Sequence, residues 1–153
     1  AEQLASIAID SANTHQILTN QKPSVALISF STLGSAEHPD VVKVRQATAK
    51  VQDLMPSLNV CGELQVDAAL IPDVAEEKAP ESDVAGRANV LIFPDLSSGN
   101  SAYKLVERLG GCQAIGPILQ GLACPWMDLS RGCKSDDIVV AAMIASVLSS
   151  TTN

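Results

Sequence analysis

Short apolar runs alternate along the chain with stretches that are apolar on one side only. In residues 3–19 and 40–55 the apolar positions recur at helical spacing, and Pro39 suits the first turn of the second of these helices. Continuous apolar runs at 24–31 and 87–95 predict strands buried on both faces, as in a parallel sheet. Strand, loop and helix repeated with short connections predict an α/β fold with a mainly parallel sheet.

The C-terminal third of the pattern is less regular. It predicts a helix over 101–111, closed by two glycines, and a short strand near 113–119. Residues 117–134 resemble a loop that carries the chain from one structural unit into another. A last helix runs from about Ser135 to Ser149, and because it is apolar nearly all round, we expect it to be buried.

Composition narrows the class of protein. A chain of 153 residues suffices for one domain with a real core, or for one and a half small ones. The net charge of −7 and the lack of a Lys/Arg cluster argue against nucleic acid and an anionic membrane surface as partners. The chain contains no run of about 18 apolar residues, so no transmembrane helix is predicted.

The start of the chain and its cysteines suggest its context. The chain opens at Ala1 without a methionine or a signal peptide, which suggests a piece of something longer. Its four cysteines form no CxxC pair and only two histidines are present, so a zinc site is improbable. A reducing cytoplasm fits this cysteine usage best.

Small polar residues follow three of the expected strands, in the loops 31–35, 94–100 and 127–132. Ligands bind at the carboxyl ends of parallel strands, where small residues admit a ligand and helix N-termini offer unpaired N–H groups to an anion. The same residues are common in ordinary turns, so each loop taken alone is more often only structural. The candidate substrate contacts in the first two loops are Ser31, Thr32, Gly34, Ser35, Gly99 and Asn100.

The third loop adds charged residues. Arg131 could grip a phosphate or an acyl oxygen with two donors, although a solvated surface arginine is the commoner case. If Ser135 caps the last helix, Asp136 and Asp137 occupy its first turn, where the helix dipole favours carboxylates. The ordinary pKa values of an aspartate and a thiol differ by roughly 4 to 5 units, or about 6 kcal/mol. A catalytic Asp137 therefore needs desolvation, or Arg131 nearby to stabilise the thiolate product.

Two further residues carry candidate chemistry. Lys104, on the helix after the second loop, could point at the same cleft, although a helical lysine usually faces solvent. Asp67 stands beside apolar residues, as a buried hydrogen-bonding group or as a site residue. The residues alone therefore indicate an α/β domain with an anion-binding cleft.

Several long stretches resemble a known family. In chain order they are "VALISFSTLGSAEHP", "GELQVDAAL", "KAPESDVAGRANVLIFPDLSSGN", "AYKLVERLGG", "AIGPILQG" and "DLSRGC". They resemble the C-terminal half of phosphotransacetylase (phosphate acetyltransferase). The resemblance implies a three-layer α/β/α fold of the isocitrate/isopropylmalate dehydrogenase-like type. It also implies reversible acetyl transfer between CoA and phosphate, with CoA, acetyl-CoA, phosphate and acetyl phosphate as substrates, no tightly bound cofactor and no catalytic metal.

The resemblance assigns roles to three residues of the "SRG" region. Asp137 is the base that removes the thiol proton of CoA, and Arg131 binds acyl phosphate and steadies the oxyanion. Ser130 hydrogen-bonds near the reacting thiol. Lys104 matches the lysine of the family's "GYK"-like segment, although this chain reads "SAYK".

Length is the main departure from the family, whose catalytic chain is roughly twice as long and has its site between two α/β domains. By resemblance, residues 1–116 belong to the middle domain, and 117–153 complete the other domain, whose N-terminal part is absent. We therefore expect this chain alone to be inactive or very weak. We also expect its last helix to pack against another chain, as a dimer or by swapping.

Three alternatives stay open from the sequence. One is a phosphate butyryltransferase-type or other acyltransferase, because the loops do not settle acyl-chain length. Another is a non-catalytic module that senses acetyl-CoA, like those fused to malic enzymes. The third is a plain structural or interaction domain, which would have no affinity for CoA or phosphate.

Overall fold

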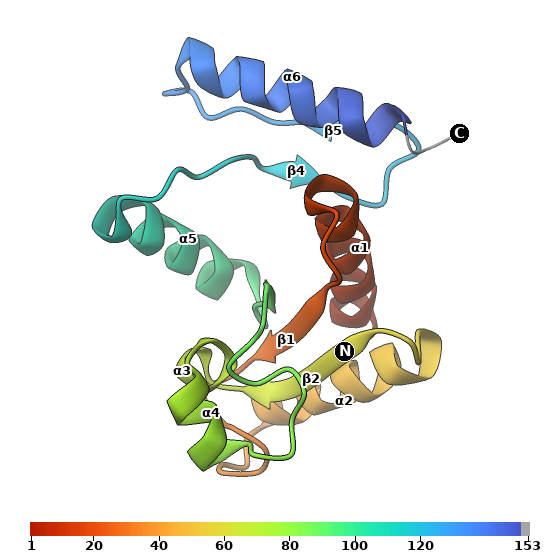
Figure 1. Ribbon diagram of the computed structural model, residues 1–153, viewed down its shortest axis with the longest axis vertical. Coiled ribbons are helices and arrows are strands. Elements are labelled where there is room, and N and C mark those ends of the chain that lie inside the picture. Colours follow the sequence, from red (N-terminus) through yellow and green to blue (C-terminus); the bar gives the residue numbers. More distant parts are fainter. Residues whose placement is uncertain (151–153) are drawn as a thin grey trace.

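A parallel sheet covered by helices on both faces forms the lower part of the molecule (Figure 1). The computed structural model describes residues 1–150. The strand order is β2-β1-β3, and both pairings are parallel. The bounds are β1 Ser24–Ile28, β2 Asn59–Leu64 and β3 Val90–Ile92. The expected α/β fold with a parallel sheet is confirmed.

Four helices surround this sheet. Their bounds are α1 Glu2–Thr19, α2 Pro39–Leu54, α3 Val66–Leu70 and α4 Pro72–Lys78. The first two agree closely with the helices predicted from the apolar spacing. Pro39 lies in the first turn of α2, and the His38 side chain accepts a hydrogen bond from the Asp40 N–H at 3.2 Å. The proline lacks an N–H that the first turn would leave unpaired, so the sequence fixes this helix start.

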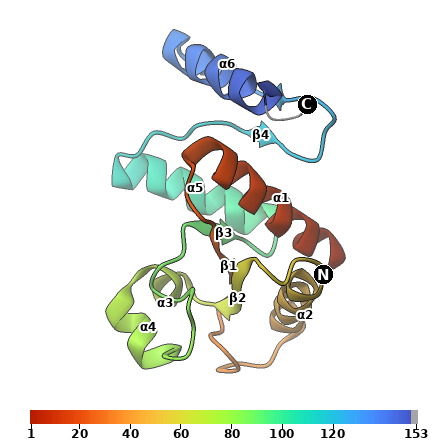
Figure 2. The same ribbon diagram turned by 45° about the vertical axis from the view of Figure 1, so that its right-hand side comes forward.

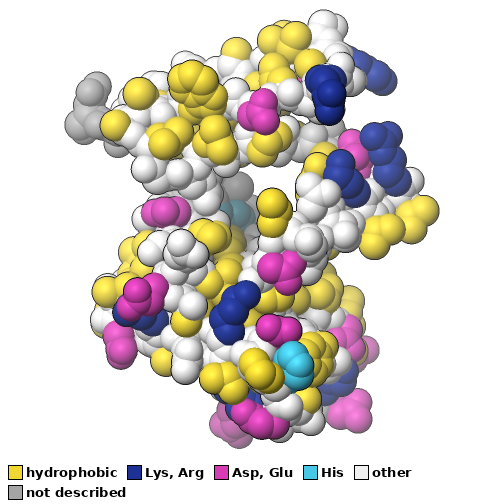
Figure 3. Space-filling view, turned by 180° about the vertical axis from the view of Figure 1, so that it is seen from behind, with side chains coloured by type: hydrophobic (Ala, Val, Ile, Leu, Met, Phe, Trp, Pro, Cys, Tyr) yellow, Lys and Arg dark blue, Asp and Glu magenta, His cyan; other side chains and the backbone are white. Residues whose placement is uncertain are grey.

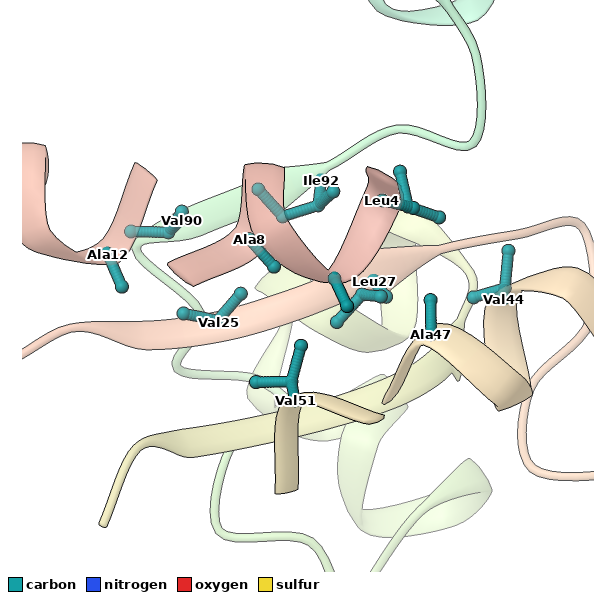
Figure 4. Close-up of a cluster of buried hydrophobic side chains, with 11 residues drawn as sticks. Leu4, Ala8, Ala12, Val25, Leu27, Val44, Ala47, Val51, Val90 and Ile92 are labelled. Carbon is teal, nitrogen blue, oxygen red and sulfur yellow. The ribbon is translucent and has the colours of Figure 1, made fainter. Parts of the chain in front are cut away.

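Alternate residues of β1 divide the core into two clusters. Val25 and Leu27 pack with α1, α2 and β3, as Figure 4 shows. Ala26 and Ile28 face the other way, toward α3, α4 and the loop that precedes β3. All four side chains are at most 4% exposed. Helices thus lie on both faces of the sheet, which gives the three expected layers.

Glu63 of β2 is an exception inside this apolar core, because it is charged and only 1% exposed. Arg45 of α2 donates to both of its carboxylate oxygens, at 2.7 and 3.0 Å. Burial disfavours the ionised carboxyl, but the hydrogen bonds from Arg45, the Gly34 N–H and the Ser31 hydroxyl outweigh it and lower the pKa of Glu63 to about 2. The pair joins α2 to the carboxyl edge of the sheet.

The second part of the chain lies above the sheet in Figures 1 and 2, where α5 is at the level of α1 and β4 and α6 lie beyond both helices. Its elements are α5 Leu96–Gly110, β4 Ile118–Leu119, β5 Trp126–Met127 and α6 Ser135–Ser150. The strands β4 and β5 pair antiparallel with each other in a sheet of their own. The strand expected at 113–119 is therefore mostly extended loop, and it does not join the parallel sheet. The loop at 127–132 thus lies away from the carboxyl edge where we had expected it.

The expected burial of the last helix is wrong for this chain. Ala141 is the only buried residue of α6. Large apolar side chains on it are 44–63% exposed: Ile138, Val139, Met143 and Val147. The physical reason is that α6 makes its main contacts with α1 and the short β5, so much of its circumference has no close neighbour.

No helix within residues 1–150 has the length and the apolar character that a membrane crossing needs.

Candidate active site

A cleft of about 380 Å³ lies between α5 and the segment that leads into α6. Figure 3 shows a hollow on this face, with Lys and Arg side chains on both sides of it. The lining residues are Tyr103, Lys104, Glu107, Arg108, Gln113, Ala114, Ile115, Gly116, Pro117, Asp128, Leu129, Ser130, Gly132, Cys133, Asp137 and Val140. Lys104, Ser130 and Asp137, which the sequence singled out, are therefore brought to one cleft.

One wall of this cleft is the side of α5 that carries residues 103, 104, 107 and 108. The helix starts at a side-chain cap, where the Asp95 carboxylate accepts the Ser98 N–H at 2.8 Å. That hydrogen bond lowers the pKa of Asp95. Gly111, with a left-handed φ of 66°, ends the helix. Because both ends are defined, the order of side chains on the cleft wall is fixed by helical geometry.

The opposite wall is the turn at residues 130–133 and the first turn of α6. The Ser130 side-chain oxygen accepts the Gly132 N–H at 3.3 Å, and its carbonyl accepts the Cys133 N–H at 2.9 Å. These bonds close a tight turn that holds the Ser130 hydroxyl at the cleft.

Asp137 closes the start of α6 and also faces the cleft. Its carboxylate accepts the Lys134 N–H at 2.8 Å, and the Gln113 side-chain amide donates to it at 3.5 Å. Since α6 begins at Ser135, that serine is the first helical residue and not the cap that the sequence suggested. The capping hydrogen bond is instead donated by the Lys134 N–H, which precedes the helix, to the carboxylate of Asp137 in the third helical position.

Arg131 is exposed and, among the described residues, is not one of those that line this cleft, although Ser130 and Gly132 on either side of it are. The structure thus separates the arginine of the "SRG" motif from the serine and the aspartate. A rotation of the long Arg131 side chain is needed before it reaches a ligand held between the two walls.

The loop after β1 forms a different polar cluster. The Ser31 hydroxyl donates to Glu63 at 2.9 Å, and the Gly34 N–H donates to the same carboxylate oxygen at 2.9 Å. The Ser35 hydroxyl accepts the Thr32 N–H at 3.0 Å, and the Thr32 hydroxyl accepts the Gln65 N–H at 3.0 Å. These four candidate residues use their polar groups to hold the loop together and to bind it to β2 and to the residue that follows β2, and none of them lines the cleft.

Asp67, Gly99 and Asn100 also lie outside the cleft lining. Asp67 is exposed and forms an ion pair with Lys78 at 2.9 Å, which lowers the pKa of its carboxyl. Gly99 lies in the first part of α5, where an added Cβ would approach the Phe93 side chain at 3.5 Å. Asn100 is exposed on the same helix. The sequence therefore grouped residues that the fold keeps in separate places.

Reading the sequence for functional residues missed two features. The ion pair between the buried Glu63 and the half-buried Arg45 gave no sequence signal, because the two residues are distant in the chain. Arg108 and Glu107 were also overlooked, although Arg108 follows Lys104 by four residues. That spacing places both cations on one side of a helix, so periodicity could have revealed it.

Comparison with known proteins identifies the family of the chain. A family model described as phosphate acetyl/butaryl transferase matches residues 1–146. The chain belongs to this family. A phosphate acetyltransferase of Thermoanaerobacterium thermosaccharolyticum is 60% identical over 139 residues, which are 91% of this chain and 42% of that protein. The enzyme of the same description from Bacillus subtilis is 48% identical, with 95% of this chain and 45% of its own length covered.

Solved structures of the family have the same fold. A phosphotransacetylase from Streptococcus pyogenes aligns with a TM-score of 0.92 at 51% identity, covering 95% of this chain and 44% of that one. The EutD phosphotransacetylase from Staphylococcus aureus aligns with a TM-score of 0.87 at 44% identity, covering 95% and 46%. The chain thus spans less than half the length of these relatives. The covered fractions state how much of each relative the chain matches, and not which part of it. That the chain corresponds to the C-terminal half of the relatives therefore stays a prediction.

Proposed function

We propose that the chain forms part of a phosphate acetyltransferase, which transfers an acetyl group reversibly between CoA and phosphate. The observation that carries the proposal is the cleft to which α5 contributes Lys104 and the start of α6 contributes Ser130 and Asp137. The relatives named phosphate acetyltransferase, at 48% to 60% identity, support the same reaction.

The proposed chemistry transfers a proton and an acyl group. The Asp137 carboxylate takes the proton from the thiol of CoA, and the thiolate attacks the carbonyl carbon of acetyl phosphate. Formation of the C–S bond gives a tetrahedral intermediate, whose collapse breaks the C–O bond to phosphate, so acetyl-CoA and phosphate leave. The reverse reaction returns the proton from Asp137 to the thiol. Arg131 stabilises the oxyanion of the tetrahedral intermediate, and the Ser130 hydroxyl hydrogen-bonds near the sulfur.

The cost of thiol deprotonation is met by positive charge around the sulfur. An ordinary aspartate and thiol differ by roughly 4 to 5 pKa units, so a thiolate needs stabilisation worth about 6 kcal/mol. Lys104 and Arg108 on the facing wall, together with Arg131 swung inward, supply cations to the thiolate and to the phosphate. No side chain acts as a nucleophile in this scheme, so both substrates must be bound together.

We infer the same division of the chain that the resemblance implied. Residues 1–116 form the middle α/β domain, and 117–153 complete another domain. The separate β4–β5 sheet and the exposed α6 support this division. Since residues 151–153 lie outside the described structure, the support covers the segment only to residue 150. The chain by itself is then inactive or very weak, and the active form assembles as a homo-oligomer.

Two further expectations accompany this proposal. We propose a cytoplasmic location, which the four free thiols support because cytoplasm keeps thiols reduced. We also propose further substrate contacts from Ser31, Thr32, Gly34, Ser35, Asp67, Gly99 and Asn100, although the bonds described above already give several of these a structural role. The reaction as proposed needs no tightly bound cofactor and no metal.

The test compares two neighbouring acids in the chain joined to the complementary half of a relative. Asp137→Asn should lower kcat at least about 100-fold, because a general base contributes about 10²–10⁴. Asp136→Asn is the matched control, because it removes the same charge from the neighbouring residue. Asp136 is exposed and does not line the cleft. Acetyl phosphate formation from acetyl-CoA and phosphate is the measurement, with Arg131→Ala and Ser130→Ala alongside.

Retained turnover in Asp137→Asn would overturn the assigned roles. Comparing acetyl-CoA with butyryl-CoA tests the acyl preference, and preference for butyryl-CoA would replace acetyl transfer as the activity. Binding of acetyl-CoA without any turnover in the joined protein would make the chain a sensing module.

A further inference from the structure

Two hydrogen bonds connect α1 to the residue just after β4, which lies beside the second half of that helix (Figures 1 and 2). The Ser11 hydroxyl donates to the side-chain oxygen of Gln120 at 3.1 Å. The side-chain nitrogen of Gln120 donates to the Thr14 hydroxyl at 3.0 Å. Ser11 and Thr14 are three residues apart, so they lie on the same side of α1. Both ends of one amide thus have a partner on one helix.

This contact crosses the boundary between the two parts of the chain. Helix α1 belongs to the first part, where Ala8 and Ala12 pack it into the core of the parallel sheet. Gln120 belongs to the second part. Among the described residues, no ion pair joins residues 1–92 to residues 93–150. The amide of Gln120 is therefore a specific polar contact between parts that otherwise meet mainly through the packing of α6 on α1.

The hairpin that Gln120 fastens to α1 forms part of the cleft wall at its other end. Strands β4 and β5 pair antiparallel, and beyond them the Asp128 N–H donates to the Pro117 carbonyl at 3.3 Å. Pro117, Asp128 and the nearby Ser130 line the cleft. Gln120 follows Pro117 by three residues, about 10 Å along an extended strand. The short ladder thus has Gln120 at one end and the cleft at the other.

The two walls of the cleft are attached to the sheet in different ways. Helix α5 follows β3 after only three residues, so the start of its wall is fixed at the end of a core strand. The opposite wall, at residues 130–133 and the first turn of α6, comes after the hairpin in the chain. It is held on the first part where α6 and Gln120 contact α1. A shift of the hairpin relative to α1 therefore changes the distance between the walls.

We propose that Gln120 is a positioning residue, whose hydrogen bonds to Ser11 and Thr14 hold the hairpin on α1 and so keep Ser130 and Asp137 at a fixed distance from α5. The effect on turnover rests on the proposed function, whereas the contact itself does not. A misplacement of about 1 Å, caused by a change far from the reacting atoms, can cost about 100-fold in rate. Gln120 does not line the cleft, so it acts only through the hairpin.

The first measurement uses the 153-residue chain and needs no activity. Trp126 is its only tryptophan and lies in β5 opposite Leu119, so its fluorescence anisotropy decay reports motion of the hairpin. Gln120→Leu removes both polar groups from a side chain of similar size and should make the decay faster. Ser11→Ala combined with Thr14→Val should have the same effect without any change in the hairpin. An unchanged decay in Gln120→Leu would overturn the proposal.

The second measurement is turnover in the joined protein. Gln120→Leu should lower kcat about tenfold and leave KM for acetyl-CoA within about twofold, because a misplaced wall acts on the chemical step. The assay is run well below the midpoint of thermal unfolding, where circular dichroism shows each variant folded and a loss of stability alone leaves kcat unchanged. Gln52→Leu is the matched control, because it removes the same amide from an exposed position on α2. Wild-type kcat in Gln120→Leu would overturn the proposal.

A double-mutant cycle links the loss of turnover to the contact with α1. Adding Gln120→Leu to the Ser11→Ala and Thr14→Val pair should lower kcat no further, because the hydrogen bonds are already absent. Additive losses would overturn the proposal, since Gln120 would then act through other neighbours. Absence of turnover in the wild-type joined protein would reject the proposed function instead, and the anisotropy decay of Trp126 would still decide whether Gln120 holds the hairpin.

Discussion

Residues 1–92 and 93–150 differ in how they use their apolar side chains. The first part contains both buried clusters, which close around a parallel sheet. Of the described residues in the second part, only Ala141 is buried. There Leu96 is 84% exposed, Leu109 83% and Trp126 64%. The apolar pattern of a helix therefore indicates which of its sides can be buried. Whether that side is buried depends on the other elements that the chain places against it.

This difference bears on function because the entire lining of the cleft comes from residues 103–140. The candidate active site thus lies in the part of the chain that has the least packing of its own. The sheet part supports α1, on which α6 rests, and it contributes no side chain to the cleft lining. Such an arrangement fits a site completed by further protein on the open side, as the relatives' greater length suggests.

The largest expected contrast comes from one leucine in each part. Leu27 is 0% exposed in the core, whereas Leu109 is 83% exposed on α5. Leu27→Ala should lower the free energy of unfolding by about 4 kcal/mol, because it leaves a cavity among packed side chains. Leu109→Ala should change it by less than about 0.5 kcal/mol. Urea unfolding followed by circular dichroism measures both values.

A comparable loss in the two leucine variants would break the comparison. It would mean that α5 is buried in solution, by self-association of this chain for example. Repeating the measurement at several protein concentrations would reveal such association, because the stability would then depend on concentration.

The ion pair of the buried Glu63 with the half-buried Arg45 offers the next largest effect. Glu63 lies in the core part and binds Arg45, Ser31 and the Gly34 N–H. Glu63→Gln should cost about 3 kcal/mol, because it places an amide N–H₂ against the Arg45 guanidinium and removes the partner charge. Glu107→Gln is the control in the second part, because this half-buried glutamate pairs with an exposed arginine, and the change should leave the unfolding free energy within about 0.5 kcal/mol. An unchanged unfolding free energy in Glu63→Gln would show that the ion pair makes no net contribution to stability.

Acid should weaken the core part through the same residue. The folded-state pKa of Glu63 is about 2, below its ordinary value of 4.5. A lowered pKa adds stability that is fully present above pH 4.5 and is lost as the pH falls to about 2. The unfolding free energy of the wild-type chain should therefore fall across this window, and Glu63→Gln should flatten the slope. Parallel slopes in the two proteins would contradict this assignment.

The sequence predicted α1, α2 and β1 of the first part well, and in the second part it predicted the position of α6 but not its surroundings. Helix α1 and strand β1 have strong periodicity and neighbours within the chain, so pattern and structure agree. The last helix has an equally strong apolar pattern, but its burial depends on contacts that this chain does not make. In the candidate site, the residues around Ser130 were found by motif. The separation of Arg131 from the cleft depends on side-chain direction, which no spacing rule gives.

Two glycines give a smaller contrast between the parts. A Cβ on Gly62 would lie 2.6 Å from the Thr48 hydroxyl and 2.8 Å from Leu27 Cβ, while one on Gly132 would meet nothing within 4 Å. Gly62→Ala should therefore cost about 2 kcal/mol through overpacking of the core. Gly132→Ala should be nearly neutral for stability. Thermal unfolding of both variants tests this, and a neutral Gly62→Ala would show that β2 can shift away from α2.

The smallest effect separates folding from chemistry at Asp137. Its carboxylate accepts the Lys134 N–H at 2.8 Å, so Asp137→Ala should cost about 1 kcal/mol as a lost helix cap. Asp137→Asn keeps an acceptor oxygen at the same place and should cost only a few tenths of a kcal/mol. Neither an amide nor a methyl group can take a proton from the thiol, however, so both variants should lose turnover equally. If turnover in the joined protein followed the stability order instead, with Asn nearly active and Ala not, then Asp137 would serve the fold of α6 and another group would serve as the base.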